Sequence, residues 1–376
     1  MIERPLRRGL IAGAAIVVAS VSIASVARST GASCSLDPVA SANIAGDTLS
    51  AVAPLADGVL MVGTQYSGST GGALEATIGA DGTYDAHVLR VAGGRSTQLD
   101  DVAVSGMRAW AVGAVGHYSP VVVALDGSAW TAMPISDPGP NEDGLSGVAL
   151  VSPREIWAVG RHQIGPESDF VPLIERSDGV SWRIVPSTSA GSSSMLRDVV
   201  AVGADDLWAV GWSVTSGGMR TLVERWNGSA WSIVSAPSPG VDAILTDVAA
   251  TGPSDVWAVG RTGRGDITHP LIEHWDGDRW SVVAPPQAPS SQLLSVATTS
   301  GGIVIAGRAS DGRSEPEPVA WRLSGGRWTD LSFAIQGVGW LNAIGADASG
   351  SLWGVGAVFP ENATTAGLAV RGCAAA

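Results

Sequence analysis

Residues 256–260 read Val-Trp-Ala-Val-Gly, and close copies of this phrase recur along the chain of 376 residues. Every copy ends in Val-Gly or Ala-Gly, and the final glycines are spaced 50, 47, 51, 49, 47 and 49 residues apart. The seven copies end at Gly63, Gly113, Gly160, Gly211, Gly260, Gly307 and Gly356. A repeat of about 50 residues in a strand-rich chain is typical of a β-propeller with one four-stranded blade per repeat. The sequence therefore predicts an all-β fold, a seven-bladed β-propeller with antiparallel blades.

The fifth repeat indicates how one copy forms one blade. Its apolar stretch 245–249 predicts the innermost strand, 256–260 the second strand and 271–275 the third. The pair Asp276-Gly277 is typical of a tight turn between hairpin strands, and a fourth strand is expected from Trp280. Prolines then carry the chain to the next blade.

Ten of the fifteen tryptophans occupy two repeated positions, five in the second strand and five at the start of the fourth. Exposed indoles in a row could form a stacking platform for sugars. We favour wedges packed between neighbouring blades, because every blade meets the same packing problem. These residues are Trp110, Trp157, Trp208, Trp257 and Trp353 in the second strand, and Trp130, Trp182, Trp231, Trp280 and Trp328 in the fourth.

Three repeats carry an aspartate in the innermost strand, within the phrase Leu-x-Asp-Val, at Asp101, Asp198 and Asp247. A ring of carboxylates could bind a metal. Three copies in seven blades, without calcium-type spacing, instead favour hydrogen bonds to a turn of the same blade. We therefore expect no metal and no cofactor.

The formal net charge is −13, and lysine is absent. No basic run follows the first eight residues, which argues against nucleic acid as a partner. Charge of this kind suits a soluble surface outside the cell.

The N-terminus resembles an export signal. Arginines at positions 4, 7 and 8 precede an uncharged stretch, 9–27, that ends in Ser-Val-Ala. We favour a Sec signal over a twin-arginine signal, and over an uncleaved anchor because the apolar run is slightly short for a membrane span. Residues 1–33 are thus expected to be signal peptide and short leader, and 34–376 the propeller, secreted or held at the cell envelope, without a membrane span in the mature chain.

The two cysteines, Cys34 and Cys373, bracket the predicted propeller. Cys34 precedes Leu49 by 15 residues, about the distance at which other repeats open their fourth strand. Residues 367–371 match a third strand, which would place Cys373 in the following turn and leave the last blade without a fourth strand of its own. We expect residues 34–38 to supply that strand and a disulfide to lock the ring. Acylation of Cys34, as in lipoproteins, is the alternative.

These Trp-x-Val-Gly and Asp-Gly-x-x-Trp repeats resemble those of secreted bacterial β-propellers, and they are distantly similar to Asp-box and kelch-type propellers. The resemblance covers residues 34–376 and implies the fold. Propellers of this kind include sialidases, lyases, assembly factors and lectins, so the resemblance assigns no catalytic residue.

Ligands usually reach a propeller at the face where the loops between blades and the loops after the second strand surround the central channel. Three arginines share one position there, and two tryptophans break the repeat pattern nearby. Guanidinium groups beside aromatic faces suit an anionic group such as a sugar acid, a phosphate or a peptide carboxylate. The alternative is that each arginine pairs with a local acid. The candidate ligand-binding residues are Arg161, His162, Trp212, Arg261, Arg308 and Trp340.

The sequence thus favours a non-catalytic binding or scaffold propeller, a monomer that recognises a protein or glycan partner through this loop face. The alternative is a glycan-active hydrolase or lyase at the same channel mouth. Glu167 would then be the catalytic residue, with Asp169 as a second carboxylate, or Tyr66 or Tyr118 would be a nucleophile. None of these residues has a spacing that specifies a reaction, so the enzyme question stays open.

Overall fold

The computed structural model describes most of the chain after residue 35. The chain divides into two units between Ser33 and Cys34. The first unit lies wholly outside the described residues, so the signal peptide and leader stay a prediction. The described residues are 36–39, 47–67, 70–91, 96–116, 119–127, 129–139, 141–165, 169–265, 267–286, 290–310, 315–331, 338–359 and 365–374.

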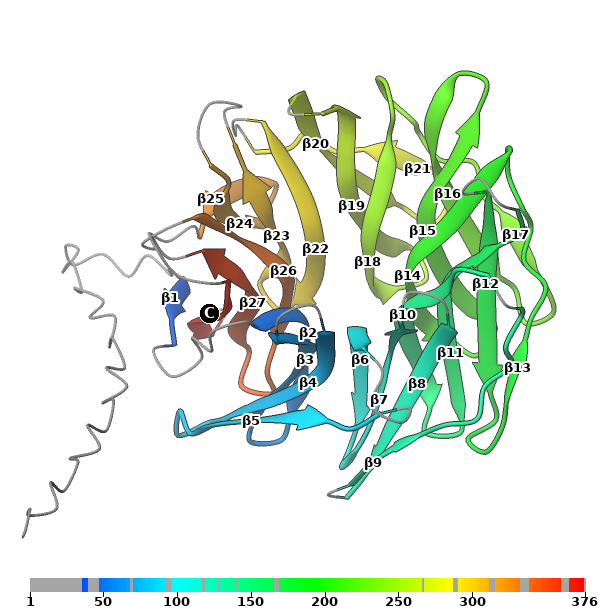
Figure 1. Ribbon diagram of the computed structural model, residues 1–376. Coiled ribbons are helices and arrows are strands. Elements are labelled where there is room, and N and C mark those ends of the chain that lie inside the picture. The colour runs from blue at the N-terminus through cyan, green and yellow to red at the C-terminus, as the bar shows by residue number, and fades with distance from the viewer. Residues whose placement is uncertain are drawn as a thin grey trace, which may run out of the picture. The chain divides into compact units, whose positions relative to one another are not determined.

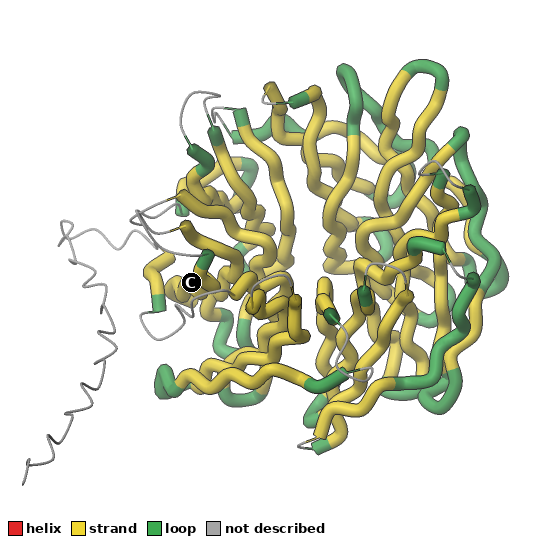
Figure 2. The backbone as a smooth tube through the Cα atoms, viewed as in Figure 1, coloured by secondary structure: helices red, strands yellow, loops and turns green. Residues whose placement is uncertain are grey.

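Seven antiparallel sheets of four strands each form a ring, as the repeats predicted (Figure 1). The first strands of neighbouring blades contact one another around the centre, so each blade runs outward from them. Loops and turns are confined to the strand ends (Figure 2). Among the residues that the structure describes, no helix is suited to crossing a membrane.

The blades are numbered in chain order, and each is given from its innermost to its outermost strand. Blade 1 comprises β2 (Asp47–Leu55), β3 (Gly58–Ser67), β4 (Thr70–Gly79) and β5 (Tyr84–Leu89). Blade 2 comprises β6 (Thr97–Ser105), β7 (Arg108–Val115), β8 (Ser119–Asp126) and β9 (Ala129–Ala132). Blade 3 comprises β10 (Asp143–Ser152), β11 (Glu155–Gln163), β12 (Phe170–Ser177) and β13 (Trp182–Ile184).

Blade 4 comprises β14 (Ser193–Gly203), β15 (Asp206–Thr215), β16 (Gly218–Trp226) and β17 (Trp231–Ile233). Blade 5 comprises β18 (Ile244–Gly252), β19 (Asp255–Arg264), β20 (Ile267–Trp275) and β21 (Trp280–Val282). Blade 6 comprises β22 (Ser291–Thr299), β23 (Gly302–Ala309), β24 (Glu317–Ser324) and β25 (Arg327–Asp330). Blade 7 comprises β26 (Val338–Ala346), β27 (Ser351–Phe359), β28 (Ala366–Ala374) and, as its outermost strand, β1 (Leu36–Pro38).

The ring closes as predicted, because the N-terminal strand β1 completes blade 7. β1 pairs antiparallel with β28, and Leu36 stands opposite Gly372. The Leu36 side chain is fully buried in the apolar core that blades 6 and 7 share. Cys34 lies outside the described residues. Cys373 belongs to β28 and not to the turn that we expected, and the disulfide stays a prediction.

The repeated tryptophans are wedges between blades, as predicted. Trp157 of blade 3 is fully buried, and its ring centroid lies 4.8 Å from that of Trp226 in blade 4. Trp208 of blade 4 is likewise buried and lies 4.9 Å from Trp275 of blade 5. A fourth-strand indole completes each cluster, Trp280 lying 5.5 Å from Trp208 edge to face. Edge and tilted contacts of this kind add to the burial of apolar area.

Each innermost strand carries a β-bulge at the same place, one residue after a buried leucine. A bulge leaves one residue without a partner in the neighbouring strand and redirects its side chain. The residue is therefore free to vary from blade to blade. The seven bulge residues are Ser50, Asp100, Ser146, Arg197, Thr246, Leu294 and Asn342.

The repeated aspartates follow these bulges, and our expectation for them was wrong. Each one bonds the innermost strand of the next blade, where we expected a turn of its own blade. The bonds run from Val148 N–H to Asp101 Oδ2 (2.7 Å), from Val248 N–H to Asp198 Oδ2 (3.0 Å) and from Val296 N–H to Asp247 Oδ2 (2.7 Å). Burial raises the pKa of Asp101 to about 7. In the described part of the chain, no group of these acids is arranged to hold a metal ion.

Candidate functional site

The candidate residues lie at one level of the ring, at the end of each blade that carries the loops between blades. We call this end the loop face. Strand pairing fixes the level, because the residue after each repeated glycine stands opposite the residue before the inner-strand leucine. The opposed pairs are Gly144 with Arg161, Met195 with Trp212, Ile244 with Arg261, Gln292 with Arg308, and Trp340 with Ala357.

Arg161 pairs with a local acid, as the alternative interpretation proposed, and the neighbouring His162 also contacts one. Arg161 Nη2 donates to Glu142 Oε1 at 2.7 Å, and His162 Nδ1 lies 2.7 Å from Oδ1 of the buried Asp143. The Arg161 guanidinium also lies over the Phe170 ring at 5.4 Å. Arg161 Nε is buried and has no hydrogen-bond partner among the described residues.

Arg261 and Arg308 have neutral partners instead. Arg261 Nη1 donates to the carbonyl oxygen of Gly263 at 2.8 Å. Arg308 donates from Nε and Nη2 to Oε1 of Gln292, at 3.2 and 2.8 Å. Its guanidinium lies 5.7 Å from the centroid of the Trp340 ring. A carbonyl or amide oxygen orients a guanidinium without neutralising it. Arg261 also interacts with Asp242, which is ion-paired with Arg264; the hydrogen bond from Arg264 lowers the pKa of Asp242, and the charge of Arg261 lowers it further.

The sequence analysis missed a fourth arginine, Arg197, at the bulge of β14. Burial lowers the pKa of Arg197, repulsion from Arg161 and Arg261 lowers it further, and the charge of Asp100 raises it. Its side chain is nevertheless open to solvent. A solvent-exposed inner-strand residue that interacts with blades 2, 3 and 5 must project into the central channel. The variable position of the Leu-x-Asp-Val phrase was the sequence signal for it.

The four arginines form one cationic cluster, which we call the arginine mouth. It comprises Arg161, Arg197, Arg261 and Arg308. Burial also lowers the pKa of Arg308, and repulsion from Arg261 adds to that effect. The structure therefore brings together three of the predicted residues with one that was not predicted. Asp100 offsets part of their mutual repulsion, and an anion bound among them would relieve more of it.

The two predicted tryptophans lie at the same level, and both are half-buried. Trp340 lies against Arg308 and packs on Phe359, with 5.1 Å between the ring centroids. Trp212 follows the repeated glycine of blade 4, between the arginine-bearing blades 3 and 5. Of the residues for the enzyme alternative, Glu167 and Tyr118 lie outside the described residues. Tyr66 is 51% exposed in blade 1, and the exposed Asp169 belongs to blade 3.

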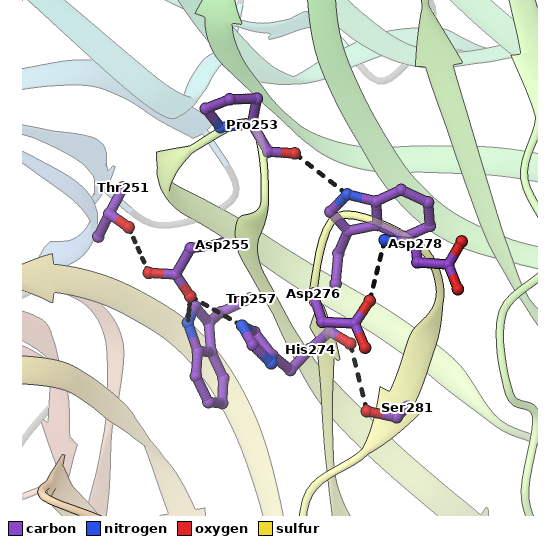
Figure 3. Close-up of polar contacts among 9 residues, drawn as sticks. Thr251, Pro253, Asp255, Trp257, His274, Asp276, Asp278 and Ser281 are labelled. Carbon is purple, nitrogen blue, oxygen red and sulfur yellow. Dashed lines mark hydrogen bonds and ion pairs between the residues drawn. The ribbon is translucent and has the colours of Figure 1, made fainter.

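The opposite end of the ring, the turn face, carries a repeated cluster that the sequence analysis also missed. In blade 5, Asp255 Oδ1 accepts a hydrogen bond from Trp257 Nε1 at 2.7 Å. The same oxygen lies 2.7 Å from His274 Nε2, with which it also forms a hydrogen bond (Figure 3). The His274 ring stacks on Trp257 with 4.1 Å between centroids. In blade 4, Arg225 replaces the histidine. It bonds both oxygens of Asp206 at 2.7 and 3.0 Å and lies 4.7 Å from the Trp208 ring.

The phrase that encodes this cluster is an acid two residues before the second-strand tryptophan. It reads Glu-Ile-Trp in blade 3, Asp-Leu-Trp in blade 4 and Asp-Val-Trp in blade 5. A basic residue stands opposite the tryptophan on the third strand, 49 residues from its equivalent in the next blade, as Arg176, Arg225 and His274 do. Repetition with the same partners marks these basic residues as part of the blade packing.

Comparison with solved structures agrees with the propeller fold. The chain is similar to YCF48 bound to D1 peptide, at 15% identity over 88% of this chain and 94% of that one, with a TM-score of 0.57. It is similar to U3-55K at 11% identity over 89% and 99%, with a TM-score of 0.56. It is also similar to the Aleuria aurantia lectin in complex with α-methyl-L-fucoside, at 14% identity over 78% and 98%, with a TM-score of 0.50.

No protein-family model and no curated sequence matches the chain. At these identities the similarity shows the fold alone, and that fold supports protein-binding and glycan-binding neighbours alike. The finer similarity to Asp-box and kelch-type repeats stays a prediction.

Proposed function

We propose that this protein is a non-catalytic binding propeller that recognises an anionic group of a protein or glycan partner at the arginine mouth. The observation that carries the proposal is the convergence of Arg161, Arg197, Arg261 and Arg308. They come from four consecutive blades. Besides burial, the charges of Arg161 and Arg261 lower the pKa of Arg197, and the charge of Arg261 lowers the pKa of Arg308. Four cations at one channel mouth stand out in a chain with a formal charge of −13.

The chemistry of the mouth supports an oxyanion as the recognised group. Guanidinium groups donate in a fixed fork that matches carboxylate, phosphate and sulfate oxygens. Arg261 and Arg308 are held by neutral oxygens, and Trp340 and Phe170 present aromatic faces to Arg308 and Arg161. A ligand that carries an acid on an apolar or sugar framework would use both features.

The structural neighbours are consistent with such a partner. One neighbour carries a bound D1 peptide, and another a bound fucoside. We infer that the present chain uses the same kind of loop-bearing scaffold for a peptide or a glycan, with the anionic group as its distinguishing requirement.

The test is binding to two arrays, one of peptides and one of glycans, each with acidic and neutral members of matched length. We expect the acidic members to bind, and the Arg197→Gln/Arg261→Gln double variant to lose at least about tenfold in affinity. Arg327→Gln is the matched control, since Arg327 is an exposed arginine of blade 6 on the turn face. Binding that prefers neutral members, or that survives in the double variant, would contradict the proposal.

We also propose that residues 1–33 direct export and are then removed, leaving the propeller outside the cell or at its envelope. Support comes from the arginines and the uncharged stretch of the N-terminal sequence. N-terminal sequencing and intact mass of protein recovered from culture medium and envelope fractions test this. A mature protein that still begins at Met1 would contradict it.

A further inference from the structure

A recess of about 200 Å³ opens on the loop face between blades 5 and 6. β20 of blade 5 forms one wall, and the starts of β22 and β24 with the end of β23 form the others. Six of the eight lining residues have polar side chains. The eight residues are Gly265, Thr268, Ser290, Ser291, Gln292, Arg308, Ser310 and Pro316.

Arg308 brings a fixed positive charge to this recess. Gln292 binds two of its nitrogens, and the Trp340 ring lies against the guanidinium, so the group is held in one orientation. Among the described residues, no acid lies within ion-pair distance of Arg308. Burial lowers the pKa of Arg308, and the charge of Arg261 lowers it further.

Ser291 lies on the other face of blade 6 from Arg308. It stands opposite Ala309, whereas its neighbour Gln292 stands opposite Arg308, and successive residues of a strand point to opposite faces of the sheet. The buried Ser291 hydroxyl therefore does not donate to the same oxyanion as the arginine.

The neighbouring wall is already organised. Ser290 Oγ accepts from the N–H of Thr268 at 3.0 Å and donates to its carbonyl oxygen at 2.7 Å. The N–H of Ser310 donates to the Ser290 carbonyl at 2.8 Å, which joins blade 6 to the same wall. A wall fixed before binding lowers the entropic cost of binding.

We propose that this recess is a subsite for a small oxyanion-bearing molecule the size of one sugar ring. Its carboxylate, phosphate or sulfate accepts from the Arg308 guanidinium, and its hydroxyls meet the polar side chains of the remaining wall. The volume lies below the range of about 300–1,000 Å³ that drug-sized ligands occupy, which fits one ring with one charged substituent. The inference rests on the proposed function and deepens it by assigning one arginine a defined ligand class.

Calorimetric titration of the full chain with glucuronate, glucose 6-phosphate and glucose tests the subsite. We expect saturable binding of at least one of the two acids and none of glucose; the acid that binds identifies the preferred oxyanion. Arg308→Gln should weaken that binding at least about tenfold. The turn-face control Arg327→Gln should leave it unchanged, and urea unfolding of each variant guards against misfolding.

Absence of saturable binding by both acids would overturn the subsite, as would equal affinity for glucose, or acid binding that Arg308→Gln leaves intact. The peptide and glycan arrays test the arginine mouth separately, because they compare the parent protein with the Arg197→Gln/Arg261→Gln double variant. Array binding without binding of either small acid overturns the subsite alone. Small-acid binding without acidic array ligands overturns the proposed function alone.

Discussion

The two ends of the ring use the same amino acid in different ways. On the turn face, Arg225 is bonded to Asp206 and lies on Trp208, and Arg176 has equivalent partners one blade earlier. On the loop face, the described residues give Arg261 a backbone carbonyl and Arg308 a neutral amide as hydrogen-bond partners. Within the described part of the chain, the first pair of arginines is ion-paired and the second pair is not.

The difference teaches how to separate packing from recognition in a repeat protein. A residue that recurs with the same partners in successive blades solves a problem common to every blade. A residue that recurs without a compensating partner, or that breaks the pattern as Arg197 does, is explained by nothing in the packing. The predictions below probe this comparison.

The largest expected effect lies at the seam where the ring closes, because both faces depend on a closed ring. A bridge between Cys34 and Cys373 would stabilise the fold by at most roughly 5–6 kcal/mol on the chain-entropy model, because it restricts the unfolded chain. Denaturant unfolding with and without reductant measures it, with Cys34→Ser as the matched variant. Two titratable thiols in the exported protein, or a lipid on Cys34, would rule the bridge out.

The next largest expected effect is a difference in stability between variants of repeated and unrepeated tryptophans. Trp208→Ala should destabilise the fold by roughly 3–5 kcal/mol, since the indole is fully buried against Trp275 and Trp280. Trp212 lies on the loop face and is half-buried, so Trp212→Ala should lower the free energy of unfolding by only about 1–2 kcal/mol. Urea unfolding measures both variants. Equal losses would show that position in the repeat does not distinguish packing from recognition.

A third prediction concerns repeated residues that destabilise the fold near neutral pH. Glu175, Glu224 and Glu273 occupy one position of the third strand, and all three are fully buried. Burial raises their pKa values to about 7, 7 and 8, although Ser187 donates to Glu224. Both oxygens of Glu273 lack partners among the described residues.

The folded state therefore holds protons that the unfolded chain releases near its usual pKa of 4.5. Stability is greatest below that value and falls as the pH rises toward about 8. Glu273→Gln should flatten this decline and stabilise the protein at pH 8, by on the order of 1–3 kcal/mol. Asp278→Asn, at an exposed turn of the same blade, is the control. Unfolding curves from pH 5 to 8 that rise with pH in the parent protein would refute this.

Much of the fold could be predicted because its signals are local and repeated. The Trp-x-Val-Gly phrase gave the number of blades, the Asp-Gly-x-x-Trp phrase gave the fourth strands, and the spacing before Leu49 indicated that residues 34–38 close the ring. Each signal spans only a few residues, so it can be recognised in the sequence without knowing which residues of the neighbouring blade it contacts.

The missed features all depend on contacts between distant parts of the chain. The bond from Val148 to Asp101 crosses 47 residues, and Arg225 meets Asp206 across a hairpin of 19 residues. Arg197 was missed because its role comes from a bulge that turns one variable side chain toward the channel. Three of the candidate arginines were found, because they follow the repeated glycine. Their partners, such as Glu142 and Gln292, lie on loops or strands that the repeat does not specify.

The central claim is tested most directly by two single variants, Arg225→Gln and Arg261→Gln. Stability and binding of acidic ligands are measured for each. The account predicts that Arg225→Gln loses about 1–2 kcal/mol of stability and still binds the acidic array ligands. It predicts that Arg261→Gln unfolds within about 0.5 kcal/mol of the parent and binds at least about tenfold more weakly. If Arg261→Gln instead destabilises the fold while acidic ligands still bind, arginine on the loop face is part of the packing and the account is contradicted.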